Sequence, residues 1–391
     1  MEMYKSGYPS RHALRASGRD RDMLVEAFSK LPNLQTVGLR DYNARGRFRD
    51  GENAVWRSYG WSCNGLFTSD NARCLLDRDE IEASLPLILY ALGHAHSTPG
   101  SLEVFLRHRD RLTPRSFNVL DGFMSSAIIP VLEGLKVLML TTGGELNPDY
   151  MVPPEDPILD DDNGIEAPMR RFFHYTPNLE TLRLNFQPYQ WLAYRFLSWF
   201  AKPASVLSSP PGPAVSPVPP VSLPNLTKLD LGMLTVKDQT LLQVITKFDL
   251  TSLSLWKVTL QCDDPGAIYL PTHWADLLRK LSDTLPASTR LKHVLIGYAS
   301  QKGHATVVPV FFKDSEGQQA NRIEYRSRYG SNVKDWLRVR AAETAVEEPP
   351  VMDSSSESGN HSGEDTDGVD EEYEEDDESE SSPSNSDDDE A

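Results

Sequence analysis

The residues of this chain that are best equipped for chemistry are arginines interleaved with aromatic rings between Arg40 and Trp61. They are Arg40, Arg45, Arg47, Arg49 and Arg57 alternating with Tyr42, Phe48, Trp56, Tyr59 and Trp61. Guanidinium and aromatic groups together can bind a phosphate, a carboxylate or a peptide. The plainer interpretation, which we favour, is a long loop that leaves a strand, with its arginines paired internally and its rings packed at the end of the fold.

The sequence signatures of enzymes and of metal sites are missing. The chain has no GxGxxG, no Walker A loop, no HExxH and no GxSxG. His94 and His96 form an HxH pair, but two ligands do not complete a zinc site, so we interpret them as helix-end or turn residues. Cys63, Cys74 and Cys262 form no CxxC and are more typical of lone thiols. The sequence therefore predicts that the protein is not an enzyme and holds no cofactor or metal.

Charge is divided unequally along the 391-residue chain. The whole chain carries 39 Lys and Arg against 57 Asp and Glu, but positions 341–391 hold 21 of the acids and no Lys or Arg. Positions 1–340 therefore have a net charge of +3, which lacks the basic excess of a nucleic-acid-binding protein, so nucleic acid is not an expected partner. Residues 341–391 contain too few apolar side chains to offset the entropy of ordering a backbone, and we expect them to be disordered.

The acidic tail offers several roles. Four serines stand three residues before an acid and are candidate phosphosites, namely Ser354, Ser362, Ser384 and Ser386. Phosphate groups there would make the tail more negative. The tail could bind basic proteins, or it could fold back over a basic cluster made of Arg322, Arg326, Arg328, Lys334, Arg338 and Arg340. The alternative for the tail is that it only solubilises the chain. The alternative for the basic cluster is a last repeat whose charges are solvated.

A recurring phrase, Leu-x-x-Leu-x-Leu or a close variant, defines the elements that would position binding residues. Its first leucines are Leu34, Leu135, Leu179, Leu226, Leu250 and Leu291, with steps of 101, 44, 47, 24 and 41 residues. Such a unit must stack on neighbours to bury its apolar face, and the 24-residue step is that of a leucine-rich repeat. The longer steps indicate inserted loops, and the first gap leaves room for a degenerate repeat at Leu102 to Leu106, with leucines out of register with the others. The predicted fold class is α/β, an irregular leucine-rich-repeat solenoid (horseshoe) with a disordered acidic C-terminal tail.

Helical periodicity appears between the phrases, where an outer helix of each repeat is expected. The apolar stripes lie at Met23 to Lys30, Gln239 to Phe248 and His273 to Leu285. Six aromatic residues crowd the segment from Tyr189 to Phe200, and we interpret them as core packing in preference to a partner-binding patch.

Composition divides the chain into three parts. Two stretches rich in proline, 147–168 and 202–222, interrupt the repeats and are typical of loop insertions. The resulting division is an N-terminal segment, the solenoid with its two insertions and the acidic tail, at 1–22, 23–340 and 341–391.

Alternation along each strand assigns a binding face. In Leu182-Arg183-Leu184 the leucines point into the core, so the residues between and beside them point to the concave surface, the default binding surface of a solenoid. The same alternation places there Thr36, Gly38, Arg40, Val137, Met139, Thr141, Thr181, Asn185, Lys228, Asp230, Gly232, Ser252, Ser254, Trp256, His293, Leu295 and Gly297. From this face we select five candidate partner-binding residues: Arg40, Arg183, Lys228, Asp230 and Trp256.

A resemblance adds a functional expectation. The stretch ALRASGRD from Ala13 to Asp20, followed by LPNLQTVGLRDYNARGRFRDGENAVWRSYG, resembles the N-terminal part of the receptor region in a large group of filamentous-fungal F-box proteins, and the likeness extends to about Trp336. It implies a leucine-rich-repeat-like receptor that presents a protein substrate to a Skp1-cullin ubiquitin ligase. The 30 residues ahead of Leu31 are too few for an F-box, so Skp1 is an expected partner only if an F-box exists upstream.

The chain also departs from a regular leucine-rich repeat. The position that normally carries Asn or Cys holds Tyr42, Gly143, Gln187, Leu234, Val258 and Ala299. The buried asparagine ladder is therefore absent, and we expect an irregular solenoid.

A competing hypothesis comes from the acidic tail. A leucine-rich domain with an acidic C-terminus is similar in layout to the acidic leucine-rich nuclear phosphoproteins, which bind histones. The chain shows no secretory signal, and one of its longest apolar stretches, Leu85 to Leu92, is far below the roughly 20 residues of a bilayer span. Both hypotheses place the protein in the cytoplasm or nucleus, away from membranes.

Overall fold

The computed structural model describes residues 13–40, 82–106, 112–120, 125–143, 166–186, 190–204, 217–261, 272–302, 307–313, 317–328 and 332–346. All of them belong to one unit, Met1–Glu348, and the second unit is Pro349–Ala391. The four candidate phosphosites, the three cysteines and all of the Arg-aromatic segment except Arg40 lie outside the described residues.

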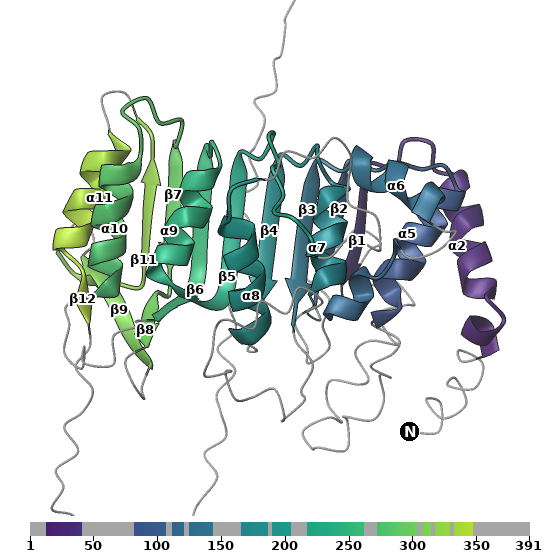
Figure 1. Ribbon diagram of the computed structural model, residues 1–391, viewed down its shortest axis with the longest axis horizontal. Coiled ribbons are helices and arrows are strands. Elements are labelled where there is room, and N and C mark those ends of the chain that lie inside the picture. Colours follow the sequence, from purple (N-terminus) through teal and green to yellow (C-terminus); the bar gives the residue numbers. More distant parts are fainter. Residues whose placement is uncertain are drawn as a thin grey trace, which may run out of the picture. The chain divides into compact units, whose positions relative to one another are not determined.

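Seven strands form a parallel ladder that follows the order of the chain (Figure 1). They are β1 (Thr36–Arg40), β2 (Ser101–Phe105), β3 (Val137–Thr142), β4 (Thr181–Phe186), β5 (Lys228–Lys237), β6 (Ser252–Gln261) and β7 (His293–Gly297). Parallel neighbours need a crossover connection, and helices supply it. The α/β class is confirmed, with a largely parallel sheet.

Strand β2 corrects one expectation from the sequence. Leu102 pairs in register with Leu138 of β3 and with Val37 of β1, so the segment that looked out of register is a full member of the ladder. It has no Leu-x-x-Leu-x-Leu phrase because Pro99 and Val104 stand at positions where the phrase carries leucine.

The C-terminal end of the sheet is mainly antiparallel. Strands β8 (Ser300–Lys302), β9 (Val307–Lys313), β10 (Gln319–Ala320), β11 (Arg322–Arg326) and β12 (Ala345–Val346) complete the twelve strands within the described ranges. Strand β11 pairs with β7, and β12 pairs with β9, although β8 pairs parallel with β6. Helix α11 runs over Val333–Ala342, so regular structure continues past the boundary expected at residue 340.

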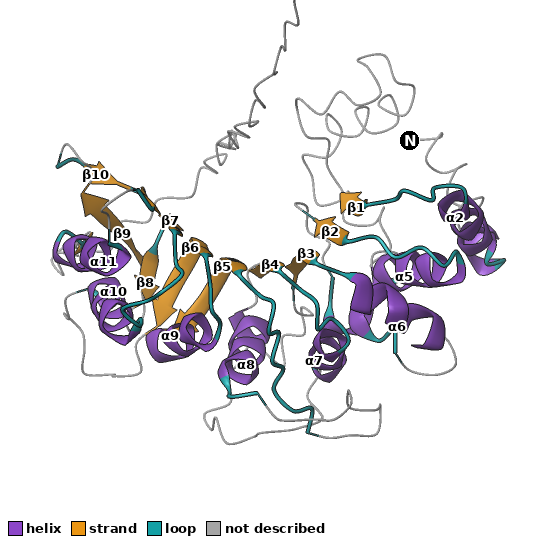
Figure 2. Cartoon of the chain, turned by 90° about the horizontal axis from the view of Figure 1, so that it is seen from above, coloured by secondary structure: helices purple, strands orange, loops and turns teal. Residues whose placement is uncertain are grey.

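The helices lie on one face of the sheet (Figure 2). They are α2 (Arg19–Ser29), α5 (Ser84–His94), α6 (Ser125–Gly134), α7 (Ala167–His174), α8 (Gln190–Ala201), α9 (Asp238–Lys247) and α10 (His273–Thr284), with a short 3-10 helix, η2, at Pro114–Phe117. The three predicted helices are confirmed as α2, α9 and α10. Within the described residues, no helix is long and apolar enough to cross a membrane.

The core lies between the sheet and these helices. Leu182 and Leu184 of β4 are fully buried, as are Leu229 of β5 and Leu253 of β6. In α8 the residues Phe196, Trp199 and Phe200 are also buried, which confirms the core interpretation for these three of the six aromatic residues, and Tyr194 is half-buried.

The two proline-rich stretches contribute to the packed structure at their ends. Ala167 and Pro168, expected in a loop, begin helix α7. Val218 and Val221, near the end of the second stretch, are buried, and the Val218 carbonyl accepts a hydrogen bond of 2.8 Å from Trp199 Nε1.

A bulge crosses three neighbouring strands at one level of the sheet. Gly232, Trp256 and Gly297 pair in register, and the residue after each has a left-handed backbone: Met233 with φ 55°, Lys257 with φ 53° and Tyr298 with φ 51°. Pairing resumes between Leu234 and Val258. The extra residue restores the buried face, because the core positions change from Leu229 and Leu231 to Leu234 and Val236.

Backbone strain at the bulge gives a stability prediction. A left-handed residue with a Cβ costs roughly 1–2 kcal/mol, which glycine avoids. We therefore expect Lys257→Gly to be more stable than Lys257→Ala by about 1 kcal/mol. At Thr259, in the same strand beyond the bulge, the order should reverse, with Thr259→Gly less stable than Thr259→Ala by about 0.5–1 kcal/mol. Urea denaturation of the four variants tests this, and the same order at both positions would contradict it.

Candidate protein-binding face

The side of the sheet opposite the helices presents the alternate side chains of β1 to β7, and we call it the helix-free face because no described helix covers it (Figure 2). All five candidate residues lie at outward positions of these strands: Arg40 on β1, Arg183 on β4, Lys228 and Asp230 on β5, and Trp256 on β6. Lys228 is exposed and the other four are half-buried. The structure thus brings Arg183, Lys228, Asp230 and Trp256 onto three adjacent strands and leaves Arg40 on the first.

The ring of Phe105 on β2 lies close to two arginines of the helix-free face. The Arg40 guanidinium lies 5.0 Å from its ring centroid and the Arg183 guanidinium lies 5.6 Å from it. Arg40 also pairs with Glu103 at 3.3 Å. Arg40 is therefore largely neutralised, whereas Arg183 reaches the ring while remaining beside Asp230.

Asp230 occupies the middle of the face. Its backbone pairs in register with Arg183 and Ser254, and Lys228 precedes it on the same strand. Burial raises the pKa of the Asp230 carboxyl, and the charges of Arg183, His293 and Lys228 lower it by less. A carboxylate that is disfavoured in this way would gain from a hydrogen-bond donor or a cation on a partner.

A polar network joins β6, β7 and β11. The Ser252 hydroxyl and His293 Nδ1 are 2.9 Å apart, and His293 Nε2 lies 2.9 Å from Glu324 Oε1. Glu324 also accepts hydrogen bonds from Arg326 at 2.6 Å and from Arg322 at 3.4 Å. Burial acts to raise the pKa of Glu324, but the hydrogen bonds from Arg326 and His293 outweigh it and lower that pKa. A hydroxyl, an imidazole and a carboxylate in line resemble a hydrolase triad, but here the carboxylate is held by two arginines.

Trp256 packs on the neighbouring strand. A Cβ on Gly297 would come within 2.3 Å of the indole, so the ring lies directly against that glycine. Tyr298 contacts the indole edge to face, with centroids 4.9 Å apart and planes at 72°. Tyr298 as a whole is 40% exposed.

Three residues expected on the exposed surface are buried instead. Gly232 and Gly297 are two of them. Gly232 is covered by Asn185, whose Oδ1 would lie 2.4 Å from an added Cβ, and Gly297 is covered by Trp256. Thr141 is 4% exposed. Alternation gave the correct side of the sheet for all three, but the exposure of the two glycines was decided by neighbouring side chains.

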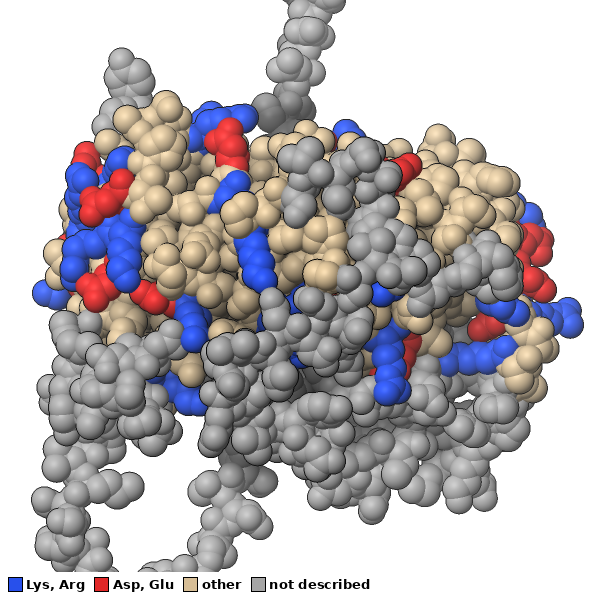
Figure 3. Space-filling model, in the orientation of Figure 1, with Lys and Arg blue, Asp and Glu red and all other residues tan. Residues whose placement is uncertain are grey.

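The basic cluster before the tail is largely paired within the protein. Arg322 and Arg326 bind Glu324, Arg338 binds Asp283 and Asp335, and Arg340 binds Glu343. The Lys334 ammonium donates to the Leu285 carbonyl at 2.7 Å. Figure 3 shows basic and acidic side chains intermixed at this α10 and α11 end. The local geometry therefore favours a paired surface over a free basic patch.

The helix layer contains charges of its own. Glu166 is 1% exposed and is held by Arg170 and Arg195, each at 2.8 Å, which ties α7 to α8. The Lys247 ammonium donates to the Phe200 carbonyl at 2.7 Å, and desolvation lowers the pKa of Lys247 to about 8. These groups lie in the helix layer and take no part in the helix-free face.

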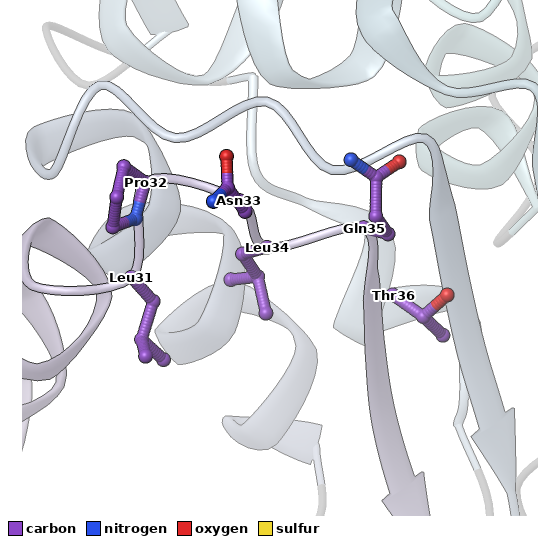
Figure 4. Close-up of a pocket in the computed structure, with 6 residues that line it drawn as sticks. All are labelled: Leu31, Pro32, Asn33, Leu34, Gln35 and Thr36. Atoms are coloured by element: carbon purple, nitrogen blue, oxygen red, sulfur yellow. The ribbon is translucent and has the colours of Figure 1, made fainter.

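A surface hollow of about 560 Å³ lies beside the turn before β1 and is lined by Leu31, Pro32, Asn33, Leu34, Gln35 and Thr36 (Figure 4). These six consecutive residues include no titratable group, and none belongs to the polar network. Within the described ranges no cluster of His, Cys, Asp and Glu has metal-site geometry. His94 ends helix α5 and His96 follows in a turn with φ 52°.

Sequence reasoning did not select Glu103, Phe105 or Glu324 for the face. Strand β2 and strand β11 carry no leucine phrase, and this caused the omission. Each does alternate polar and apolar residues, as Ser101-Leu102-Glu103-Val104-Phe105 and Arg322-Ile323-Glu324-Tyr325-Arg326. A search for period-two alternation would have found both strands.

A comparison with known families finds no family model that matches the chain, and a comparison with curated proteins finds no match.

The raised pKa of Asp230 predicts that its charge destabilises the fold. Below about pH 4 the carboxyl is protonated in both states and the cost is absent, and the cost grows as pH rises through the raised pKa. We expect Asp230→Asn to increase the melting temperature at pH 7, with a gain that shrinks toward pH 4. Asp249→Asn, at an exposed pair with Arg290, is the control and should change little. An equal or lower melting temperature of Asp230→Asn at pH 7 would contradict the prediction.

The lowered pKa of Lys247 predicts that stability rises with pH in the alkaline range, opposite in sign to the effect of Asp230. Its pKa is about 8 in the folded state and roughly 10.4 in the unfolded state, so the unfolded state binds more protons between these values. The free energy of unfolding should therefore contain a term that rises from pH 8 to pH 10. Lys247→Met should remove this rise, whereas the exposed Lys280→Met on α10 should keep it. Urea titrations at three pH values measure the difference, and an unchanged profile in Lys247→Met would refute the assignment.

Proposed function

We propose that this chain is a protein-recognition module that binds a partner protein through its helix-free face. The observation that carries the proposal is the placement of Arg183, Lys228, Asp230 and Trp256 at outward positions of the adjacent strands β4, β5 and β6, with no described helix above them. Arg183 and Asp230 pair directly in register. Arginine and tryptophan, two of these four residues, are enriched at protein interfaces.

We further propose that the module is an irregular leucine-rich-repeat solenoid. The proposal is supported by the recurrence of one unit, a parallel strand followed by a helix on the same face, from β2 to α10. It is also supported by the two leucine positions of each phrase, which pair strand after strand. Repeats of this kind present extended binding surfaces.

Within this class, we propose the substrate-recognition region of an F-box-type receptor, which would act without enzymatic chemistry of its own in the cytoplasm or nucleus. The resemblance of Ala13 to Asp20 and of the following phrase to fungal F-box receptors supports it. Co-purification of Skp1 with the chain extended by its upstream coding sequence tests this part. Failure to recover Skp1 would remove the ligase role but leave the recognition face.

The second candidate is an acidic-tailed nuclear protein that binds histones or other basic proteins. The 21 acidic residues of positions 341–391 favour it. It predicts salt-sensitive histone binding that disappears when residues 343–391 are removed.

Charge removal on the face tests the recognition proposal. We expect Arg183→Ala combined with Lys228→Ala to weaken partner binding by about tenfold or more, because both cations lie at the centre of the face. The matched control is Arg279→Ala combined with Lys292→Ala, two exposed cations outside the face. Quantitative cross-linking in cell extract compares the proteins captured by each variant.

We expect the face variant to lose partners that wild type and the control both capture, at an unchanged melting temperature. Equal capture by wild type, face variant and control would contradict it.

A further inference from the structure

The bulge places three side chains in a row across the sheet. Met233, Lys257 and Tyr298 each follow a residue of the register line Gly232, Trp256 and Gly297, and each has a left-handed backbone. None is glycine, although glycine would adopt this conformation without the steric cost of a Cβ. The same left-handed conformation therefore recurs at matching positions of three neighbouring strands.

Strain of this kind concentrates at ligand and partner sites, where a bulge re-aims a side chain. The Tyr298 amide donates to the Asn321 carbonyl at 2.7 Å, so the residue is held in this conformation from the β11 side. Tyr298 remains 40% exposed, although tyrosine side chains usually contribute large buried areas.

The side chains at the bulge combine an aromatic corner with a cation. Trp256 lies against Gly297, and Tyr298 meets the indole edge to face at 4.9 Å. The Lys257 ammonium lies 5.8 Å from the Tyr298 ring centroid. We call Trp256, Lys257 and Tyr298 the aromatic bulge site.

The charge around the aromatic bulge site is positive. On β4, β5 and β6 the nearby cations are Arg183, Lys228 and Lys257, and Asp230 is the one acid at the outward positions that the structure describes on these strands. Three cations against one acid leave the positive charges in excess. A complementary segment of a partner would carry negative charge beside an apolar side chain.

We propose that the aromatic bulge site binds an extended acidic segment of a partner protein, with an aromatic or aliphatic side chain against Tyr298 and Trp256 and a carboxylate beside Lys257. The inference rests on the proposed function and deepens it, because it names the class of segment that the helix-free face recognises. Aromatic corners with a cation supply the anchoring contacts in many interfaces.

The test uses the labelled full-length chain on an array of random decapeptides. We expect the bound peptides to be enriched in Asp or Glu within two positions of Tyr, Phe, Trp, Leu or Ile. Titration of one enriched peptide should show about tenfold weaker binding to Tyr298→Gly and about fivefold weaker binding to Lys257→Gln. Tyr298→Gly suits the left-handed backbone, so loss of the ring is separated from misfolding. Lys257→Glu should shift the enrichment toward basic peptides.

Matched controls are Lys292→Gln, an exposed lysine before β7, and Tyr90→Ala, a half-buried tyrosine on α5, which should bind like wild type. Enrichment of basic peptides by the wild-type chain would overturn the inference. So would unchanged binding by Tyr298→Gly and Lys257→Gln while Arg183→Ala with Lys228→Ala abolishes it, and in that case the proposed function would stand. Unchanged binding by all of these variants would overturn both.

Discussion

Burial of two rows of apolar side chains between the sheet and the helices is the constraint on which the rest of the structure depends. Each of the strands β2 to β7 and β11 contributes one residue to each row, and register keeps the rows continuous from β2 to β11. The rows are Leu102, Leu138, Leu182, Leu229, Leu253, Val294 and Tyr325, and Val104, Leu140, Leu184, Leu231, Leu255, Ile296 and Ile323, none more than 6% exposed. A single strand and helix could not bury these side chains alone, so the units must stack.

The same rows create the helix-free face. Because side chains alternate along a strand, two buried positions force the residue between them to the opposite side of the sheet. Arg183 stands between Leu182 and Leu184, and Asp230 stands between Leu229 and Leu231. Placement of these charges is therefore a consequence of core burial and needs no interaction of its own.

The bulge shows how the sheet departs from this rule without losing its core. One extra residue in each of three strands changes which residues face inward, and Leu234, Val258 and Ala299 continue the buried surface beyond it. The cost is a left-handed backbone at Met233, Lys257 and Tyr298. Strain, aromatic exposure and positive charge thus coincide at one level of the face.

The sequence by itself determined the repeating unit, the α/β class, three of the helices and the side of the sheet on which the five selected residues lie. These follow from local periodicity, which needs only the spacing of apolar residues. Tertiary structure alone decided the rest. Strands β2 and β11 entered the sheet through pairing with distant partners, and the exposure of Gly232 and Gly297 depended on side chains from other segments. The environment of Asp230 and the internal pairing of the basic cluster also arise only when strands far apart in the chain lie side by side, because burial and charge are properties of neighbours in space.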